Sequence, residues 1–389
     1  MVGHPEGASC YENPHMATEP GSNQRLADGL AGLPALDQVR AAADDERLYL
    51  VGGAVRDILL GRPRGDIDVV VEDGDPGELA RALGGRELSG GRFTTASAEI
   101  DGVRVDLAGS RRETYPAPGA LPEVSPAPLA DDLARRDFTV NAMALPLQGE
   151  PELIDPHDGQ ADLEAGRLRV LHERSFVDDP TRALRAARYA ARLGFELEEQ
   201  TERLLRAADL GTVSGDRVTA ELRRIAAEPQ PRRALELAAE WGLIPLEPGD
   251  AELVERVAVL LDAAPWNEVA LRPAAVLAAL EGPSDEVRRM ASEKPNRPSE
   301  AVALAAGRTG VELALARALG AEWLDRYVEE WRDVRLEIDG EDLMAAGVPE
   351  GPAVGRGLTA ALAAKLDGEA SGREGELAAA LRAANSLGE

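Results

Sequence analysis

The sequence of 389 residues lacks several features that would place it in a special structural class. It has one cysteine, Cys10, which excludes an internal disulfide framework and fits a reducing cytoplasm. No stretch approaches 18 consecutive apolar residues, and the N-terminus has no positively charged segment followed by an apolar core. We therefore expect a cytoplasmic protein with neither a transmembrane helix nor a secretory signal. Aromatic residues make up only 3%, so the cores must rely on leucine, alanine and valine.

Positive charge is also scarce, since 43 lysines and arginines face 70 aspartates and glutamates and the net charge is −27. Such a balance usually argues against a nucleic-acid partner. Residues 166–228 differ, with 12 arginines against 11 acidic residues. This segment is therefore compatible with a nucleic-acid partner, and the acidic excess elsewhere could simply be a solubilising surface.

Helical spacing dominates after about residue 165, whereas the part before it mixes strand-like and helix-like runs. The pattern predicts an α+β fold, in which a head with a small mixed sheet precedes an all-α remainder. We expect a disordered leader, the head, a helical neck, a helical body and a helical tail at residues 1–30, 31–165, 166–228, 229–320 and 321–389. Residues 111–130 are rich in proline and glycine and show neither the helical nor the strand periodicity, so we expect a mobile loop there.

The head is organised around residues 48–72, where two apolar runs flank the double glycine Gly52 and Gly53. Glycines after a strand let backbone N–H groups approach a triphosphate without a Cβ atom in the way. Arg56 follows and offers a fork of donors suited to phosphate oxygens. The segment is neither a Walker loop nor a GxGxxG turn. An ordinary strand–helix–strand turn remains the alternative.

Three aspartates in strand-like segments are candidates for a metal site. Asp66 and Asp68 are two residues apart, so in a strand they point to one face, about 6–7 Å apart at Cα. Two adjacent carboxylates repel unless a cation lies between them, and Mg²⁺ binds carboxylate oxygens together with substrate phosphates. Asp106, in another strand-like run, supplies the third acid of a two-metal phosphoryl-transfer site. Alone, Asp106 would more often be a surface strand residue, and two solvated aspartates are the alternative for Asp66 and Asp68.

Arg135 and Arg136 stand next to Asp137 and form another candidate contact with a nucleotide. Two arginines beside a carboxylate can hold a triphosphate or a ribose, while the acid fixes their rotamers. A solvated charge cluster is the alternative. The four histidines form no cluster with zinc spacing, and no His-Asp pair suggests a metal phosphohydrolase.

Asp179 and Arg182, with Arg185 and Arg188 after them, begin a predicted helix and lie along one side of it. A carboxylate acceptor and a guanidinium donor one turn apart match the pairing edges of cytosine and adenine, which both offer an amine beside an acceptor. Guanine and uracil do not offer this pattern. The alternative is a basic helix face that contacts phosphates or its own acidic residues.

Taken together, these segments resemble the class II tRNA nucleotidyltransferase and bacterial poly(A) polymerase family. The resemblance covers about residues 45–228 and rests on six ordered motifs, LVGGAVRD, DID, VDLAGSRRE, DLARRDFTVNAMA, DPHDGQADLEAGRLRVL and FVDDPTRALRAARYAARLGF. Residues 336–344 and 347–358 also resemble the C-terminal part of CCA-adding members. Asp178 and Asp216 stand where glutamate is commoner in the family.

The resemblance implies a polymerase β-like nucleotidyltransferase head and a role for each motif. Asp66 and Asp68 correspond to the metal-binding catalytic aspartates and Asp106 to the third catalytic acid. The positions that correspond to nucleotide contacts are Gly52, Gly53, Arg56, Arg135, Arg136, Asp137, Asn141, Asp179, Arg182, Arg185 and Arg188. Among them, Asp179 and Arg182 correspond to the protein template that selects CTP and then ATP.

The implied activity is template-independent addition of CCA to the 3′ end of tRNA from CTP and ATP, with Mg²⁺ as cofactor and pyrophosphate as product. The helical body and tail would hold the acceptor arm. A poly(A) polymerase, an A-adding specialist and a non-catalytic RNA-binding protein remain alternatives. CC-only members of the family lack part of a flexible loop in the region of 111–130, and because this segment is present, the sequence argues against CC-only addition.

Overall fold

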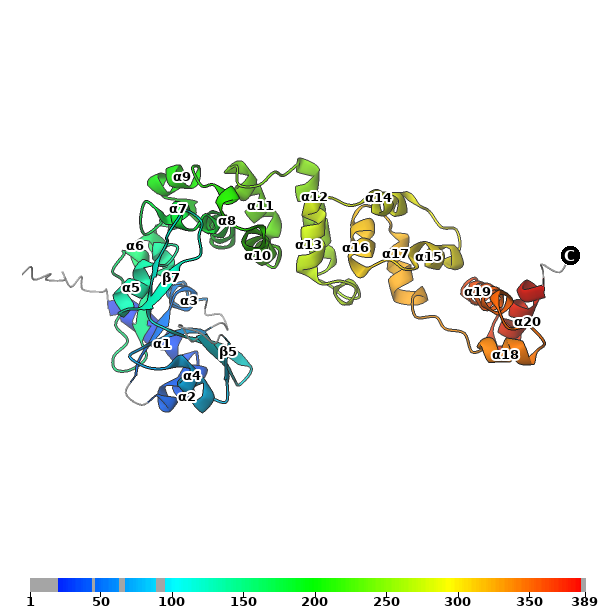
Figure 1. The fold of residues 1–389 in the computed structure, drawn as a ribbon, viewed down its shortest axis with the longest axis horizontal. Helices are drawn as coiled ribbons and strands as arrows, with labels where there is room; N and C mark the ends of the chain where they lie inside the picture. Colours follow the sequence, from blue (N-terminus) through cyan, green and yellow to red (C-terminus); the bar gives the residue numbers. More distant parts are fainter. Residues whose placement is uncertain (1–19, 44–45, 63–66, 89–94, 386–389) are drawn as a thin grey trace, which may run out of the picture. The chain divides into compact units, whose positions relative to one another are not determined.

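The protein, represented by a computed structural model, is described for residues 20–43, 46–62, 67–88 and 95–385. Two compact units are present: one contains the chain up to Arg182 and residues 195–212, and the other contains 183–194 and 213–389. Helix α8 (Thr181–Leu193) contributes to both. All strands of the described residues lie in the first unit, and the second unit is helical (Figure 1).

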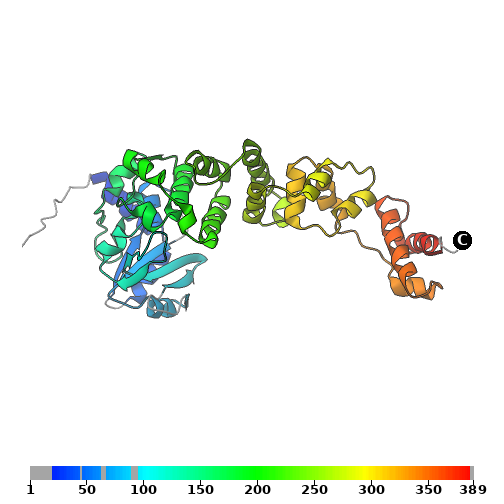
Figure 2. The same ribbon diagram turned by 45° about the horizontal axis from the view of Figure 1, so that its top comes forward.

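The first unit is built around a six-stranded sheet with the strand order β3-β4-β5-β2-β1-β8. Its strands are β1 (Arg47–Val51), β2 (Ile67–Glu72), β3 (Arg86–Glu87), β4 (Thr95–Ile100), β5 (Val103–Gly109) and β8 (Ala144–Pro146). Neighbouring strands are antiparallel except β2 and β5, which are parallel. The sheet is thus mixed, which confirms the predicted head, and its strands are visible from a second direction in Figure 2.

Helices and two small sheets complete this unit. The helices are α1 (Pro20–Ala31), α2 (Ala35–Ala42), α3 (Gly53–Leu59), α4 (Pro76–Ala82), α5 (Leu129–Ala134), η1 (Thr139–Asn141), α6 (Gly159–Glu164), α7 (Ser175–Asp178), α9 (Glu199–Leu205) and η2 (Leu210–Thr212). The small sheets pair β6 (Arg111–Thr114) with β7 (Glu123–Pro126) and β9 (Arg167–Leu168) with β10 (Glu196–Leu197). Val51 and Val70 of the large sheet pack with Leu129 and Leu133 of α5 in one buried cluster, which fixes α5 over the sheet.

The predicted disordered leader at 1–30 is wrong for its last part, because Pro20–Ala31 forms α1. Leu26 and Leu30, one helical turn apart, are buried and attach this helix to the core. Gly29 faces α3 so closely that a side chain there would collide with Ile58. The tertiary contact therefore stabilises a helix whose polar composition did not suggest it, and residues 1–19 lie outside the described part.

The predicted loop at 111–130 is wrong where β6 and β7 form, while residues 115–122 between them have no helix or strand. β6 and β7 pair antiparallel, with Arg111 opposite Pro126 and Thr114 opposite Glu123. Pro116, Pro118 and Pro122 lie between the two strands rather than inside them. Prolines in the connection interrupt no ladder hydrogen bond, and Pro126 is the last residue of β7, in a two-stranded sheet where proline is tolerated.

The expected neck at 166–228 is not all-α, since β9 and β10 form a parallel pair within it. Residues 166–182 and 195–212 also belong to the first compact unit, so this unit extends beyond the predicted head boundary at residue 165. The short strands were missed because two paired residues leave no periodic signal in the sequence.

The second unit consists of helices joined by short connections. They are α10 (Gly215–Ala226), α11 (Pro231–Glu240), α12 (Pro248–Leu260), η3 (Trp266–Glu268), α13 (Arg272–Glu281), α14 (Asp285–Ser292), α15 (Pro298–Ala305), α16 (Gly310–Ala318), α17 (Trp323–Arg326), η4 (Tyr327–Trp331), α18 (Gly340–Ala345), α19 (Pro352–Leu366) and α20 (Gly372–Asn385). Its cores use small and branched apolar residues, as in the cluster around Ile338, Leu343 and Ala380. Within the described ranges, no helix has the length and apolar character needed to cross a membrane.

Candidate active site

Two of the predicted acids lie side by side on the parallel strands of the sheet. Asp68 of β2 and Asp106 of β5 are register partners, so their Cα atoms are about 4.8 Å apart and their side chains share one face. Asp68 is exposed and Asp106 is half-buried. Nε of Arg104 donates a hydrogen bond to Oδ1 of Asp106 at 2.8 Å. The structure therefore brings two of the three predicted acids together.

Asp66, the remaining predicted acid, lies outside the described residues. Among the residues that are described, no group of three or more histidines, cysteines or acids is arranged to hold a metal ion. Asp68 and Asp106 nevertheless supply adjacent carboxylate oxygens, the hard ligands that Mg²⁺ prefers. Mutual repulsion of these two groups also favours a cation between them. The residues present therefore fit a divalent ion.

The double glycine begins beside this acid pair. β1 runs antiparallel to β2 with Leu50 opposite Val69, so the end of β1 passes next to Asp68. Gly52 precedes α3 with φ +69° and ψ −130°, a conformation that strongly favours glycine. A Cβ atom at this position would lie 2.7 Å from Nη1 of Arg136. Glycine is therefore needed here both for the turn and for the approach of an arginine.

Arg135 and Arg136 converge on one buried carboxylate, that of Asp132 on α5. Oδ1 of Asp132 is 2.7 Å from Nη2 of Arg135, and Oδ2 is 2.9 Å from Nη2 of Arg136. Burial by itself raises the pKa of Asp132, but Arg136 and Arg135 outweigh burial and hold this pKa below its usual value. The arginine side chains remain 18% and 16% exposed. Asp132 thus fixes two cations that still reach solvent and can meet an anion.

Arg56, predicted as a phosphate contact, is only 1% exposed. Its Nη2 lies 2.8 Å from Oδ1 of Asp57, and its Nη1 donates to Oδ1 of Asn141 at 2.6 Å. Nδ2 of Asn141 donates in turn to Oδ1 of Asp137 at 2.9 Å. A Cβ atom on Gly53 would lie 3.3 Å from Nη2 of Arg56, so this network contacts the glycine turn. It holds the turn in place, and direct contact of these side chains with a nucleotide stays a prediction.

Asp179 and Arg182 lie where α8 begins. Oδ1 of Asp179 accepts hydrogen bonds from the backbone N–H and the hydroxyl of Thr181, at 3.0 and 2.6 Å. Nη1 of Arg182 donates to Oγ of Ser175 and Nη2 donates to the backbone carbonyl of Arg135, both at 2.8 Å. Arg182 of the predicted base-recognising pair is therefore bonded directly to the backbone of Arg135, one of the predicted phosphate-binding residues.

Arg185 and Arg188 lie in the part of α8 that belongs to the second unit. Nη1 of Arg185 is 3.7 Å from Oε1 of Glu221, and Nη1 of Arg188 is 3.2 Å from Oε1 of Glu228. The excess of arginine in this segment is thus partly neutralised by carboxylates of α10 and its C-terminal end. A nucleotide contact of either arginine stays a prediction.

The β6–β7 hairpin contributes two residues that were not predicted as site residues. Oε1 of Glu113 accepts a hydrogen bond from Nη1 of Arg135 at 2.9 Å, and Oε2 accepts one from the hydroxyl of Tyr115 at 3.0 Å. Burial raises the pKa of Tyr115 to about 12; the charge of Arg182 opposes this rise and that of Glu113 adds to it. The hairpin therefore supports Arg135 and places Tyr115 within electrostatic range of Arg182.

Sequence reasoning overlooked Asp132, Glu113, Tyr115 and Arg104. The sequence spacing could have identified Asp132. It precedes Arg135 by three residues and Arg136 by four, and on a helix an acid at these spacings can pair with both arginines. Spacing could also have identified Arg104, which shares a strand face with Asp106. For Glu113 and Tyr115 no local pattern was available, since their partner lies on a different element.

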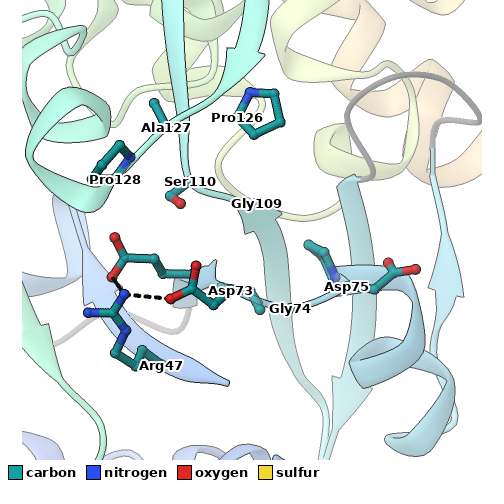
Figure 3. Close-up of a pocket in the computed structure, with 12 residues that line it drawn as sticks. Arg47, Asp73, Gly74, Asp75, Gly109, Ser110, Pro126, Ala127 and Pro128 are labelled. Carbon is teal, nitrogen blue, oxygen red and sulfur yellow. Dashed lines mark hydrogen bonds and ion pairs between the residues drawn. The ribbon is translucent and has the colours of Figure 1, made fainter. Parts of the chain in front are cut away.

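A cavity of about 640 Å³ lies at the far end of β2 from Asp68. Its lining includes Arg47, Glu72, Asp73 and Ser110. Figure 3 shows Arg47 extended toward Asp73. Nη2 of Arg47 lies 3.3 Å from Oε2 of Glu72 and 2.5 Å from Oδ2 of Asp73. Oε1 of Glu72 also accepts the backbone N–H of Leu129 at 2.8 Å. The cavity contains none of the predicted site residues, and these polar groups are engaged with one another.

Residues 48–169 match a family model described as the poly A polymerase head domain. A CC-adding tRNA nucleotidyltransferase of Deinococcus radiodurans is 39% identical over 338 residues, which cover 83% of this chain and 85% of that protein. An A-adding tRNA nucleotidyltransferase of Geobacter sulfurreducens is 33% identical over 399 residues, which cover 87% of this chain but only 45% of the relative.

A solved structure of the Thermotoga maritima CCA-adding enzyme complexed with tRNA-CCA is also similar. It superimposes with a TM-score of 0.67 at 29% identity, over 93% of this chain and 98% of that chain. The likeness confirms the predicted fold, a nucleotidyltransferase head followed by a mostly helical remainder. The names of the three similar proteins specify CC, A and CCA, so similarity alone does not fix which nucleotides this chain adds.

Proposed function

Because the chain belongs to the family of class II tRNA nucleotidyltransferases, we propose that it completes the 3′ end of cytoplasmic tRNA by adding CCA from CTP and ATP. The observation that carries the proposal is the juxtaposition of the Asp68–Asp106 pair with the Gly52 turn, which Arg136 approaches closely. Carboxylates beside a glycine turn and a fixed guanidinium are groups that can support transfer of a nucleotidyl group. No nucleic-acid template is needed, since protein side chains select the base.

The acids of the site have different roles in the reaction. The 3′-hydroxyl of the tRNA attacks the α-phosphorus in line, a new O–P bond forms, the bond to the β-phosphate oxygen breaks, and pyrophosphate leaves. Asp66 and Asp68 are the residues that would hold Mg²⁺, which supplies charge neutralisation at the α-phosphate when bound. Asp106, on the neighbouring strand, orients the attacking hydroxyl and takes its proton.

Binding of the nucleotide is assigned to the arginines around α5 and α8. Arg136 and Arg135, held by Asp132, contact the triphosphate. Asp179 accepts the exocyclic amine of cytosine or adenine, and Arg182 donates to the ring acceptor beside it. The hydrogen bond from Arg182 to the carbonyl of Arg135 supports one continuous site, because it joins the base-recognising group to the phosphate-binding group.

The test uses three transcripts of one tRNA that end before CCA, after the first C and after CC, each offered CTP and ATP separately with Mg²⁺. CCA addition requires incorporation of C on the first two substrates and of a single A on the third. The same tRNA that already carries CCA is the control and should not be extended. Failure to incorporate any nucleotide, despite binding of tRNA at moderate salt, would favour a non-catalytic RNA-binding protein.

CC addition is the second candidate, favoured by the similarity of the Deinococcus relative over most of both chains. In that case C would be incorporated on the first two substrates and no A on the third. Incorporation of A alone would indicate an A-adding specialist, and long A tracts would indicate a poly(A) polymerase. The strong net acidity makes the salt dependence of tRNA binding an informative accompanying measurement.

A further inference from the structure

Arg104 is a cation within the candidate metal site, and none of the motifs assigns it a role. It precedes Asp106 by two residues on β5, so both side chains point to the same face of the sheet. Nε of Arg104 lies 2.8 Å from Oδ1 of Asp106, which is itself the register partner of Asp68. The guanidinium thus neutralises part of the charge of two adjacent carboxylates that would otherwise repel each other.

This ion pair is accessible to solvent and therefore easily displaced. The side chains of Arg104 and Asp106 are 61% and 42% exposed. An exposed pair of this kind is held weakly, because water screens the charges and two side chains must be immobilised. A divalent ion that also engages Asp68 gains two carboxylates at once, so it competes effectively with a single guanidinium.

A second carboxylate lies opposite Arg104 on the adjoining strand. Glu99 of β4 is the antiparallel register partner of Arg104, while Ser97 is opposite Asp106. Partners that lie directly opposite in an antiparallel pair share a face, with Cβ atoms about 4.5–5.5 Å apart. Glu99 is exposed, and at this separation of the Cβ atoms its carboxylate is within the length of an arginine side chain.

We propose that Arg104 is a positioning residue that keeps Asp106 paired until a divalent ion arrives and then transfers to Glu99. The inference rests on the proposed function in that a divalent ion binds at Asp68, and it adds that Asp106 also contacts this ion before the substrates bind. In the protein without metal, Arg104 stabilises the acid pair and fixes the rotamer of Asp106. Metal binding breaks this pair, so the apparent affinity for the ion includes the cost of displacing the guanidinium.

The experiment measures binding of Mn²⁺ alone to the full chain, from the electron paramagnetic resonance signal of the free ion, with no nucleotide or tRNA present. Arg104→Gln should tighten Mn²⁺ binding about two- to fivefold, the range expected when an exposed ion pair no longer has to be broken. Arg86→Gln is the matched control. It removes the same charge from β3, whose register places Arg86 opposite Ser97, roughly 10 Å from Asp106 at Cα.

The transfer to Glu99 is tested by a double-mutant cycle. Glu99→Gln should weaken Mn²⁺ binding in the wild-type background and have a smaller effect in the Arg104→Gln background, because the two residues act through each other. The inference is overturned if Arg104→Gln binds Mn²⁺ no more tightly than Arg86→Gln, if the effects of Glu99 and Arg104 add, or if no variant binds Mn²⁺. Nucleotide incorporation by the wild type, measured separately, shows whether the proposed function stands in each of these cases.

Discussion

Replacement of Gly52 by alanine separates two reasons for a glycine at the start of α3. The sequence suggests that glycine is required so that the backbone can approach a triphosphate. The structure adds that a Cβ atom would lie 2.7 Å from Nη1 of Arg136. If the second reason dominates, Gly52→Ala acts on nucleotide binding through the arginine and not through the backbone.

The magnitudes follow from the geometry. A non-glycine residue at φ +69° and ψ −130° costs about 1–3 kcal/mol of folding free energy. The clash itself costs little stability, because Nη1 is the far end of a flexible side chain. It does move the guanidinium away from its position beside the turn, while Asp132 keeps its hold on Nη2. Loss of one charge-assisted hydrogen bond to phosphate is worth about 1.5–3 kcal/mol, or roughly 10- to 100-fold in nucleotide affinity.

The assay compares CTP and ATP affinity with urea unfolding for Gly52→Ala and for the control Gly84→Ala. Gly84 also has a positive φ of +72°, but a Cβ atom there meets no other atom within 4 Å. Both variants should lose stability, since both introduce a side chain where φ is positive. Only Gly52→Ala should lose nucleotide affinity.

A cycle with Arg136→Ala decides between the two reasons. When the arginine is absent, Gly52→Ala should cause little further loss of CTP or ATP affinity. If Gly52→Ala lowers nucleotide affinity equally in both backgrounds, the role assigned to Arg136 is refuted. Glycine would then be required because the backbone itself contacts the phosphate. Equal loss of affinity in Gly84→Ala would show that the effect arises from general destabilisation.

Three other outcomes are expected. Asp68→Asn should leave urea unfolding nearly unchanged and abolish Mg²⁺-dependent incorporation of nucleotides; an active variant would contradict the assignment of the acid. Asp132→Asn should cost about 3–5 kcal/mol at neutral pH because it leaves Arg136 and its neighbour without a buried partner. The pKa of Asp132 is lowered in the folded protein. The stabilisation by its carboxylate is therefore complete above the unfolded-state pKa of about 3.9 and is lost as the pH falls through the lower folded-state pKa. The urea midpoints of wild type and variant should accordingly converge in acid. Tyr115→Phe removes a hydrogen bond to Glu113 and should cost about 0.5–1.5 kcal/mol. Because the pKa of Tyr115 is raised to about 12, its contribution is complete below the unfolded value of about 10 and is lost as the pH rises toward the folded value, so the advantage of the wild type over the variant should shrink above pH 10.

The sequence by itself determined the local features of the site. The spacing of two residues predicted that Asp66 and Asp68 point to one face of a strand, and of these Asp68 lies in β2 while Asp66 is outside the described residues. The apolar runs predicted the strands that became β2 and β5. The order of six motifs was enough to predict the family. These features depend on residues close together in the chain, so their physical signal is present before any tertiary contact forms.

Only the tertiary structure decided how the groups combine. The register of β2 against β5 places Asp106 beside Asp68, and burial engages Arg56 in a network with Asp57 and Asn141 that supports the glycine turn. Strand register and side-chain burial depend on partners far along the chain, which neither periodicity nor composition records. The β6–β7 hairpin likewise has no signal in the sequence. Its two short strands are stabilised by each other and by the hydrogen bond between Arg135 and Glu113.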